Sequence, residues 1–510
     1  MPTRGYIGID AGTQGLSLIF TDESLNVLAA GEGSYDMVSG LNEGCYEQHP
    51  DHWIAALKEA VKQCRDKFGE EMEVLAIGIS GQMHGEVLAD QNGEPLCAAR
   101  LWCDARNDAE QDELTAALNV KMPKRITSAR WLWTLRNRPE IASKTSHITT
   151  PAGWLAFQLT GQWNLGIGDA AGMFPIDQST LNYNTGLAII FDEIASQSSN
   201  DHQEILSLLP SVCTAGSEGG VLTESGAELL GLSSGIPVAP AEGDQPAALA
   251  GSLIGQAGMV SCSFGTSVCA NSVGDRSFTG VSPAVDHFCA PDGKPINMVW
   301  LRNGTTYMNT VVEMFGSMLG DDRSTAFQSV MPKVLQAAPD CGGILALPFM
   351  DDEPGLGVSK GGTASLIGLN PENATPGNAV KAAILATMFN LKLGSQTLDQ
   401  QGFPRTELVL SGGLTKTPDL AQVLADVFNT KVSLLASAEE GTAWGATLLA
   451  KYRYAILHGE KKSWTEFLST MPNEKKEYLP DPEPVFQYDA VYQRYQSLVN
   501  AEKTMAKSSV

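Results

Sequence analysis

The chain has 510 residues, and its 34 Lys and Arg against 58 Asp and Glu give a formal net charge of −24. Hydrophobic residues at 43% and charged residues at 18% predict a globular protein with about two to four packed domains. The negative charge is accompanied by no basic cluster, which excludes nucleic acid and anionic membrane surfaces as partners, although main-chain amides can still bind phosphate. These limits favour a soluble enzyme.

Nine cysteines are scattered along the chain without a CxxC pair, which indicates neither a disulfide framework nor a zinc site. Such cysteines are typical of small core residues in a reducing compartment. Residues 1–4 run directly into the first expected strand and leave no room for the apolar segment of a signal peptide. No apolar stretch approaches the roughly 20 residues that span a bilayer. The sequence therefore predicts a cytoplasmic protein with no membrane partner.

The first hundred residues alternate strand and helix patterns. Two apolar segments, 5–10 and 16–21, predict strands joined by a short turn, and 27–30 predicts a third strand. Pro50 opens an expected helix that carries an apolar stripe on one face. The nearly all-apolar run 74–80 predicts a buried central strand. Strands that alternate with helices predict an α/β layer structure.

The same order of elements begins again near residue 258. Segment 259–264 predicts a strand, 265–267 a tight turn and 268–273 the returning strand, about 250 residues after the opening hairpin. A repeat at this distance is too long for a solenoid and predicts two domains of like fold. The later elements expected in chain order are a strand at 406–410, a helix at 418–428, a strand at 431–435 and a helix at 441–457. The polar tail after residue 463 predicts a surface wrap or loose extension.

Three glycine-containing turns follow expected strands, although no Walker sequence is present. In Asp10-Ala-Gly-Thr13, amides and a hydroxyl could surround a phosphate while the carboxylate holds hydrated Mg²⁺. Ser263-Phe-Gly-Thr-Ser267 repeats this arrangement without the carboxylate, and Ser411-Gly-Gly413 would let a flat adenine or ribose approach the backbone. Each segment is also compatible with an ordinary β-turn. Together, in this order, they favour a split nucleotide site.

Asp244 follows an apolar strand and lies just before the second expected domain. A carboxylate there could take a proton from a hydroxyl nucleophile held within hydrogen-bond reach. The alternative is a helix N-cap for the segment that begins at Pro246, because Asp before Pro is a common helix start. The residues alone leave both interpretations open.

Two further polar clusters follow the buried strand at 74–80. The segment Gly81-Gln-Met-His-Gly85 lies where ligands bind in open α/β sheets, at the carboxyl end of a strand. Trp102, Asp104 and Arg106 combine an aromatic face with a carboxylate and a guanidinium, which suits a sugar. The alternatives are a structural histidine and a surface ion pair of little energetic weight.

These motifs in series resemble the FGGY carbohydrate kinases, from about residue 6 to 457. The matching segments are Asp10-Ala-Gly-Thr13, Gly81-Gln-Met-His-Gly85, Leu101-Trp-Cys-Asp-Ala-Arg106, Gly243-Asp-Gln245, Ser263-Phe-Gly-Thr-Ser267, Ser411-Gly-Gly413 and Glu440-Gly-Thr-Ala-Trp-Gly-Ala446. Within the family, Gly81-Gln-Met-His-Gly85 is most similar to xylulokinases.

The resemblance implies an α/β fold with two ribonuclease-H-like domains of the actin/sugar kinase/chaperone type and an active-site cleft between them. Residues 1–245 would form the N-terminal domain, which binds the sugar and carries the first phosphate loop. Residues 246–460 would form the C-terminal, nucleotide-binding domain. Residues 461–510 would be an extension of unknown role.

The resemblance also implies the residues of the site. Asp244 would be the general base that deprotonates the sugar hydroxyl. The residues implied to bind the sugar are Gln82, Met83, His84, Trp102, Asp104, Arg106, Asp244 and Gln245. Those implied to bind the nucleotide are Asp10, Gly12, Thr13, Gln14, Gly265, Thr266, Gly412 and Gly413. Asp10 and Asp244 would hold Mg²⁺, directly or through water.

The implied reaction is ATP- and Mg²⁺-dependent transfer of a γ-phosphate to a ketose, with D-xylulose to D-xylulose 5-phosphate as the first expectation. Gln245 departs from the pattern, because xylulokinases usually have Asn there and Gln is the glycerol-kinase choice. D-ribulose, L-xylulose, a tetrulose and glycerol therefore stay open as substrates, and so does a non-catalytic sugar-sensing regulator. The implied partner is a small sugar, and a homodimer is left open.

Overall fold

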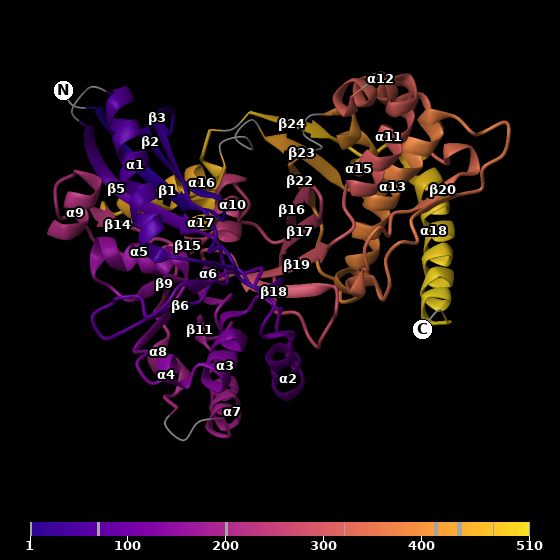
Figure 1. The fold of residues 1–510 in the computed structure, drawn as a ribbon. Helices are drawn as coiled ribbons and strands as arrows, with labels where there is room; N and C mark the ends of the chain where they lie inside the picture. The colour runs from indigo at the N-terminus through magenta and orange to yellow at the C-terminus, as the bar shows by residue number, and fades with distance from the viewer. Residues whose placement is uncertain are drawn as a thin grey trace. The chain divides into compact units, whose positions relative to one another are not determined.

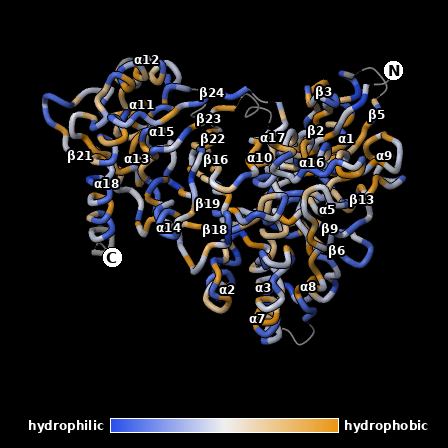
Figure 2. The backbone as a smooth tube through the Cα atoms, turned by 180° about the vertical axis from the view of Figure 1, so that it is seen from behind, coloured by the Kyte–Doolittle hydropathy of each residue, from blue (hydrophilic) through white to orange (hydrophobic). Residues whose placement is uncertain are grey.

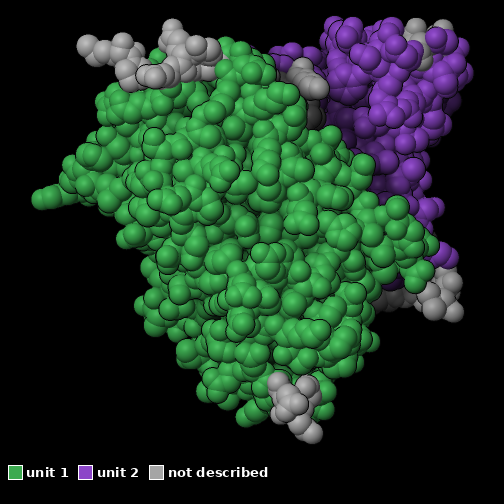
Figure 3. All heavy atoms as spheres, turned by 60° about the vertical axis from the view of Figure 1, so that its left-hand side comes forward, with its two compact units in different colours: residues 1–255, 287–296, 437–472 green, residues 256–286, 297–436, 473–510 purple. Residues whose placement is uncertain are grey.

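The computed structural model describes residues 3–68, 72–198, 202–320, 322–412, 417–435, 441–472 and 474–508. The chain forms two compact units, coloured separately in Figure 3. Unit 1 comprises residues 1–255, 287–296 and 437–472. Unit 2 comprises residues 256–286, 297–436 and 473–510.

A mixed sheet forms the centre of unit 1, with the strand order β13-β14-β5-β1-β2-β3 and β15 added beside β5. Strands β1 and β2 are an antiparallel hairpin, whereas β1, β14 and β15 each run parallel to β5. Its strands are β1 (Thr3–Ala11), β2 (Gly15–Asp22), β3 (Val27–Ser34), β5 (Met72–Gly81), β13 (Gly220–Val221), β14 (Pro237–Val238) and β15 (Glu242–Gly243). The hairpin, the third strand and the buried central strand are therefore confirmed.

The register of this sheet brings three strand ends together. Asp10 on β1 lies beside Ser80 on β5, and Ser80 lies beside Glu242 on β15. Because the carboxyl ends of parallel strands share one edge of a sheet, the segments that follow β1, β5 and β15 meet there. These are the first expected phosphate turn, the loop after residue 81, and Asp244.

Helix α16 (Gly441–Leu457) lies against β1 and β5, its gold ribbon beside the indigo strands in Figure 1. Its buried residues are mostly apolar, which appears as orange in Figure 2. Gly8 and Gly78 are neighbours in the sheet, and a Cβ on them would lie 2.0 Å from the Ala443 oxygen and 1.9 Å from the Ala446 oxygen. Only glycine permits this approach, which brings the start of α16 to the end of β1.

Other helices of unit 1 cover its sheet and carry the loops of the site. The expected helix from Pro50 is confirmed as α1 (Pro50–Phe68), with Trp53 and Leu57 fully buried. The remaining helices are α2 (Asp108–Leu118), α3 (Thr127–Asn137), α4 (Pro139–Ala142), α5 (Pro151–Thr160), α6 (Ile167–Ala170), α7 (Thr185–Ser196), α8 (Ile205–Leu208), α9 (Glu224–Leu230), α10 (Asp244–Gly251) and α17 (Trp464–Ser469). Short strand pairs are β4 (Glu47–Gln48) with β7 (Ala99–Arg100), β6 (Val87–Ala89) with β8 (His147–Thr149), β9 (Asn164–Gly166) with β12 (Ser211–Cys213), and β10 (Ile176–Asp177) with β11 (Asn182–Tyr183).

The second sheet repeats the central pattern of the first. Its order is β18-β19-β17-β16-β22-β23-β24, with β16 and β17 as an antiparallel hairpin and β22 parallel to β16. The strands are β16 (Met259–Phe264), β17 (Val268–Val273), β18 (Val285–Cys289), β19 (Pro295–Leu301), β22 (Glu407–Gly412), β23 (Lys431–Leu435) and β24 (Lys475–Tyr478). The repeated strand, turn and strand of the sequence thus correspond to equivalent hairpins of two α/β sheets.

Helices of unit 2 enclose its hydrophobic core. Helix α13 (Pro376–Gly394) is buried along most of its length, and α15 (Asp419–Phe428) and β23 match the elements expected there. The other elements are α11 (Thr306–Leu319), α12 (Arg323–Gln336), α14 (Gln396–Gln400), two 3₁₀ turns (Cys341–Gly343 and Pro354–Leu356), β20 (Leu345–Leu347) and β21 (Ser365–Ile367).

Of the two alternatives expected for the polar tail, a surface wrap or a loose extension, the loose extension is wrong for the described residues of that segment. Helix α18 (Pro482–Ser508) carries a buried stripe made of Tyr488, Val491, Tyr492, Tyr495 and Val499. This i, i+3, i+4, i+7, i+11 spacing puts the five side chains on one face, and all five belong to the core of unit 2. The tail is therefore part of a packed domain.

None of the described helices is both long and apolar enough to cross a membrane. No disulfide joins any of the nine cysteines, all of which lie in the described residues.

Candidate active site

Asp10 is the first carboxylate of the site and lies at the carboxyl end of β1. The Ser80 hydroxyl donates to its Oδ1 at 2.7 Å, and the Thr442 hydroxyl at the start of α16 donates to its Oδ2. Burial raises the pKa of Asp10, and both hydrogen bonds oppose that rise. The two hydroxyls therefore orient a carboxylate that keeps free lone pairs for a hydrated cation.

The turn after Asp10 has the compact backbone expected of it. The Gly12 amide donates to the Gly15 oxygen at 2.9 Å, and the Tyr35 hydroxyl donates to the Gly12 oxygen at 2.6 Å. Gln14 is exposed at the tip of the turn. The turn thus offers an open polar edge on a fixed backbone, while the phosphate contacts of Gly12, Thr13 and Gln14 remain predictions.

A chain of hydrogen bonds joins this turn to the loop after β5. The Gln48 amide donates to the Thr13 oxygen at 2.7 Å, and the Gln82 amide donates to Gln48 Oε1 at 2.9 Å. The Thr13 hydroxyl donates to Gln82 Oε1 at 3.2 Å and accepts from the Trp102 indole at 3.1 Å. Gln48 and Gln82 are fully buried. Gln82 therefore connects the turn after β1 to the loop after β5, and this explains a glutamine at that position.

His84 has a left-handed backbone with φ +62° and a buried ring. Its Nδ1 lies 2.9 Å from the Gly172 oxygen, so Nδ1 carries the proton and donates to it. Burial, together with the charges of Arg125 and Arg130, holds the pKa of His84 well below its ordinary value. The ring is therefore neutral, and Nε2 keeps a lone pair that can accept a hydrogen bond from a hydroxyl.

Met83 packs against Gly243 of β15. A Cβ on Gly243 would lie 2.1 Å from Met83 Cγ, so the thioether occupies the space that a side chain at 243 would need. The main-chain amide of Met83 donates to Asp244. The loop after β5 and the residue after β15 are therefore in direct contact, while their role in sugar binding remains a prediction.

Asp104 and Arg106 form a tight ion pair with Glu47. Arg106 donates to Asp104 Oδ2 at 2.6 Å and to Glu47 Oε1 at 2.6 Å. Burial alone raises the pKa of Asp104, but hydrogen bonds from Arg106 and from the Tyr46 amide outweigh it and hold that pKa below its usual value. The alternative of an exposed surface pair is wrong for Asp104, which is only 2% exposed. This pair fixes the loop, and Trp102 in the same loop is 44% exposed.

Asp244 is the first residue of α10. Gly243 occupies the N-cap position and makes no side-chain cap bond, so the interpretation of Asp244 as a cap is wrong in register. Burial, followed by the nearby charge of Asp10, raises the pKa of Asp244 to about 7. A carboxylate with this pKa is well matched to general-base catalysis near neutral pH. Gln245 follows Asp244 in the first turn of α10, and the main-chain amide of Gln245 donates to Asp244 Oδ1 at 2.8 Å.

Two buried carboxyl groups near Asp244, those of Asp169 and Glu242, were not predicted from the sequence. Asp169 is fully buried, accepts from the Thr150 hydroxyl at 2.6 Å, and leaves its Oδ1 without a partner. Burial, with a smaller effect of the Asp244 charge, raises the pKa of Asp169 to about 8. Burial and the charge of Asp169 also raise the pKa of Glu242 well above its ordinary value. Asp169 is therefore largely protonated at neutral pH, and burial favours the protonated form of Glu242 as well.

In unit 2, the second expected phosphate turn is fixed by the segment that starts α11. The Gly304 amide donates to the Thr266 oxygen at 2.9 Å, and the Thr305 amide donates to the Gly265 oxygen at 2.8 Å. A Cβ on Gly304 would lie 2.3 Å from the Gly265 oxygen, so glycine is required there. Gly412 ends β22 beside Phe264 of β16, close to this turn, and Gly413 lies outside the described residues. The nucleotide contacts of these glycines remain predictions.

The residues present fit a loosely held Mg²⁺ better than a dedicated metal cage. Among the described residues, no three His, Cys, Asp or Glu side chains are grouped as a protein-bound metal needs. Mg²⁺ in kinases is typically held by one or two carboxylates, waters and substrate phosphates. Asp10 and Asp244 supply this number of carboxylates.

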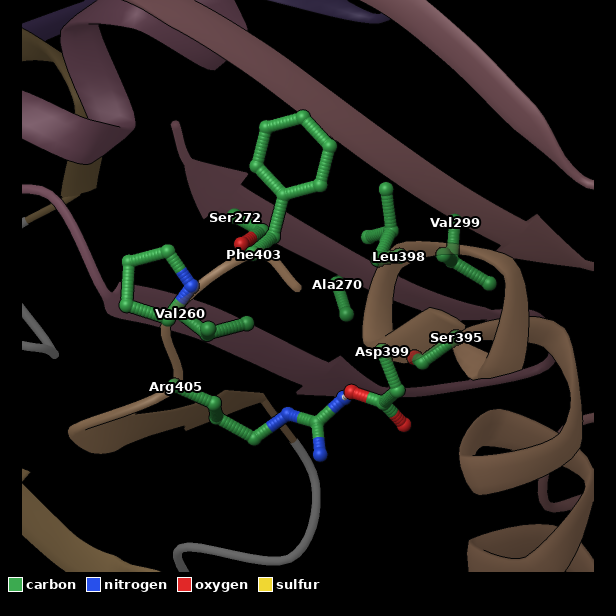
Figure 4. Close-up of a pocket in the computed structure, with 10 residues that line it drawn as sticks. Val260, Ala270, Ser272, Val299, Ser395, Leu398, Asp399, Phe403 and Arg405 are labelled. Atoms are coloured by element: carbon green, nitrogen blue, oxygen red, sulfur yellow. Dashed lines mark hydrogen bonds and ion pairs between the residues drawn. The ribbon is translucent and has the colours of Figure 1, made fainter. Parts of the chain in front are cut away.

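A small closed cavity in unit 2 is separate from these residues. It has a volume of about 10 Å³ and lies between β16, β17 and α14, with Val260, Ala270 and Leu398 in its lining (Figure 4). Asp399 and Arg405 form an ion pair of 2.6 Å at its edge. This volume holds about one water molecule and is too small for a sugar or nucleotide.

Comparison with known proteins agrees with this geometry. The N-terminal domain of the FGGY family of carbohydrate kinases matches residues 5–251, and the C-terminal domain of the same family matches residues 260–454. The chain is 28% identical to the xylulose kinase of Haemophilus influenzae, over 96% of this chain and 98% of that protein.

Solved structures of related fold have lower identity. The ligand-bound xylulose kinase of Lactobacillus acidophilus has a TM-score of 0.83 at 18% identity, covering 99% of this chain and all of that chain. The gluconate kinase of the same organism has a TM-score of 0.84 at 19% identity, over the full length of both chains. These likenesses show the fold.

The chain belongs to the FGGY family of carbohydrate kinases. It is an ATP-dependent phosphotransferase that acts on a carbohydrate, as the members of this family are.

Proposed function

We propose that this kinase phosphorylates a ketose, and D-xylulose in the first place. The supporting observation is the contact between the loop 81–85 and Asp244, which brings a neutral histidine and a base of pKa about 7 to the same edge of the sheet. A ketose offers hydroxyl groups to both. The curated relative from Haemophilus influenzae is named a xylulose kinase, which favours this sugar among the ketoses.

In this proposal Asp244 is the catalytic base. It accepts the proton of the attacking hydroxyl while the sugar oxygen forms its bond to the γ-phosphorus and the bond to the bridging oxygen of ADP breaks. Sugar phosphate, ADP and one proton are the products. Mg²⁺ bound with ATP would neutralise charge on the phosphates, and Asp10 with Asp244 are the carboxylates that would hold it.

The neighbouring groups would position the substrates. His84 accepts a hydrogen bond from a sugar hydroxyl at Nε2, and the exposed Trp102 ring stacks on the sugar. Gln82 holds the turn after β1 and the loop after β5 together through its hydrogen bonds to Thr13 and Gln48. We propose that residues 1–245 provide the sugar site and first phosphate loop, and that 246–460 bind the nucleotide through Gly265, Thr266, Gly412 and Gly413. Nine cysteines without a disulfide support a reducing, cytoplasmic location. A homodimer stays a prediction.

Gln245 supports a second candidate, the phosphorylation of another ketose or polyol such as D-ribulose, L-xylulose, a tetrulose or glycerol. It lies in the first turn of α10 beside the base, where a longer amide changes the room for the sugar. A non-catalytic regulator is disfavoured, because a retired enzyme has no need for a base of raised pKa at the edge of the sugar loop.

The test is Asp244→Asn, which keeps the shape of the side chain and removes its basicity. We expect phosphoryl transfer to fall by about 10²–10⁴-fold, while ATP binding measured by calorimetry stays nearly unchanged. Asp177→Asn, at an exposed carboxylate in the same unit, is the control and should retain full activity. Less than a tenfold loss in Asp244→Asn would remove the base assignment.

A further inference from the structure

One buried guanidinium connects the two loops of the sugar site. Arg130, on α3, is fully buried. Its Nη1 donates to the His84 oxygen at 2.9 Å and to the Arg125 oxygen, and its Nη2 donates to the Trp102 oxygen at 2.9 Å and to the Asp104 oxygen at 3.4 Å. A single side chain therefore contacts the main chain of three separate segments.

Arg130 differs in this from the other buried arginine nearby. Arg100 donates to the Glu86 carboxylate at 2.7 Å and is neutralised by it. The hydrogen bonds that the structure describes for Arg130 all go to main-chain carbonyls. Burial and the charge of Arg100 lower the pKa of Arg130 to about 9. Guanidinium in this position is costly to bury, so its contacts with the loops are a specific feature of the site.

The contact with His84 bears directly on the sugar. His84 has a left-handed backbone, which a non-glycine residue adopts only where surrounding contacts hold it. Arg130 holds the His84 carbonyl from one side, and the Gly172 carbonyl holds the ring from the other. Together these two contacts fix the direction of Nε2.

We propose that Arg130 is a positioning residue for the sugar substrate, which keeps the His84 loop and the Trp102 loop at a fixed separation. We call the hydrogen bonds of Arg130 to these two loops the clamp. The expected effect on catalysis rests on the proposed function, whereas the clamp can be tested on the protein without any substrate. Arg130 touches neither substrate. Its planar fork of donors is essential, because a lysine ammonium at the same position is a point charge that cannot reach carbonyls of three segments at once.

The first arm of the test measures the clamp without any substrate. Hydrogen–deuterium exchange is followed in peptides that contain residues 82–86 and 101–105 for wild type, Arg130→Met and Arg130→Lys. Arg136→Met is the matched control, because Arg136 lies on the same helix and pairs with Glu113 at 2.7 Å on its outer side. We expect both peptides to exchange faster in the two Arg130 variants and to be unchanged in the control.

The second arm measures kinetics with whichever sugar the wild type turns over. We expect the sugar KM to rise on the order of 10²-fold in Arg130→Met, with the ATP KM within about twofold of wild type. Arg130→Lys should recover less than half of this loss on a logarithmic scale, whereas Arg136→Met should match wild type.

Each outcome decides between alternatives. Unchanged exchange and unchanged sugar KM in Arg130→Met overturn the proposal, and equal rises in both KM values assign Arg130 a general structural role. Arg130→Lys equal to wild type would show that charge alone is needed. If Arg130→Met does not fold, Arg130→Lys decides. If wild type turns over no sugar, the proposed function fails while the exchange arm still tests the clamp.

Discussion

His84 donates from Nδ1 to the main-chain oxygen of Gly172 at 2.9 Å, across 88 residues of sequence. The ring packs so closely on that glycine that a Cβ there would lie 2.7 Å from Nδ1 and 2.8 Å from Cε1. Gly172 therefore sets both the tautomer and the position of the histidine.

Gly172→Ala should displace the His84 ring, because the added Cβ would meet it at 2.7 Å, closer than the 3.1 Å to the Asp169 main-chain oxygen, and the φ of Gly172 is not one that requires glycine. We expect the sugar KM to rise by roughly tenfold or more, with the KM for ATP unchanged. Steady-state kinetics with each substrate varied in turn measure both values. Gly186→Ala on α7 is the control, because the nearest atom to its added Cβ is 3.4 Å away.

His84→Ala gives the reference for that experiment. It should raise the sugar KM far more than the KM for ATP, because it removes the acceptor itself. An equal effect on both would take His84 out of the sugar pocket. His458→Ala, at an exposed histidine just after α16, should leave both values unchanged.

The pH dependence of the reaction should follow Asp244. Its pKa is raised to about 7 by burial and then by the charge of Asp10. A base must be deprotonated to act, so kcat/KM should be level above pH about 7 and should fall about tenfold per unit below it. A pH–rate profile between 5 and 9 measures this, and a level profile down to pH 5.5 would contradict it.

The stability of unit 1 should respond to pH through Asp169. Its pKa is about 8 in the folded protein against an ordinary value of 3.8, so the folded state holds a proton that the unfolded chain releases. The resulting stabilisation is complete below pH about 4 and is lost as pH rises to about 8, at up to about 1.4 kcal/mol per unit.

Asp169→Asn removes this ionisation. Its melting temperature relative to wild type should therefore increase from pH 5 to pH 8 and then stay constant, as measured by calorimetric scans. Asp177→Asn should show no such increase, because hydrogen bonds from Ser179 lower the pKa of that exposed carboxylate. A difference for Asp169→Asn that does not change with pH would mean that Asp169 is ionised in the folded state.

Local patterns were sufficient for the central strands and helices. The apolar segments 5–10 and 16–21, the turn between them and the repeat at 259–273 each correspond to the element expected. They succeed because their periodicity, glycines and flanking residues all indicate the same structure.

Residues whose role depends on distant partners could not be found in this way. Asp169 is buried against Thr150 and near Asp244, and Thr442 reaches Asp10 only because α16 packs onto β1 and β5. Neither contact leaves a local signal. Helix α18 did have a local signal, the helical spacing of apolar and aromatic residues from Tyr488 to Val499. It was overlooked because the segment is polar overall.

The most direct test of the account is ADP release with Mg²⁺–ATP against a panel of pentuloses, tetruloses, heptuloses, hexuloses, polyols and aldonates, with Asp244→Asn run beside the wild type. We predict strong turnover of D-xylulose by the wild type and loss of it in the variant. Turnover of another ketose or polyol instead would keep the kinase and change its substrate. Absence of sugar-dependent ADP release across the whole panel would contradict the account.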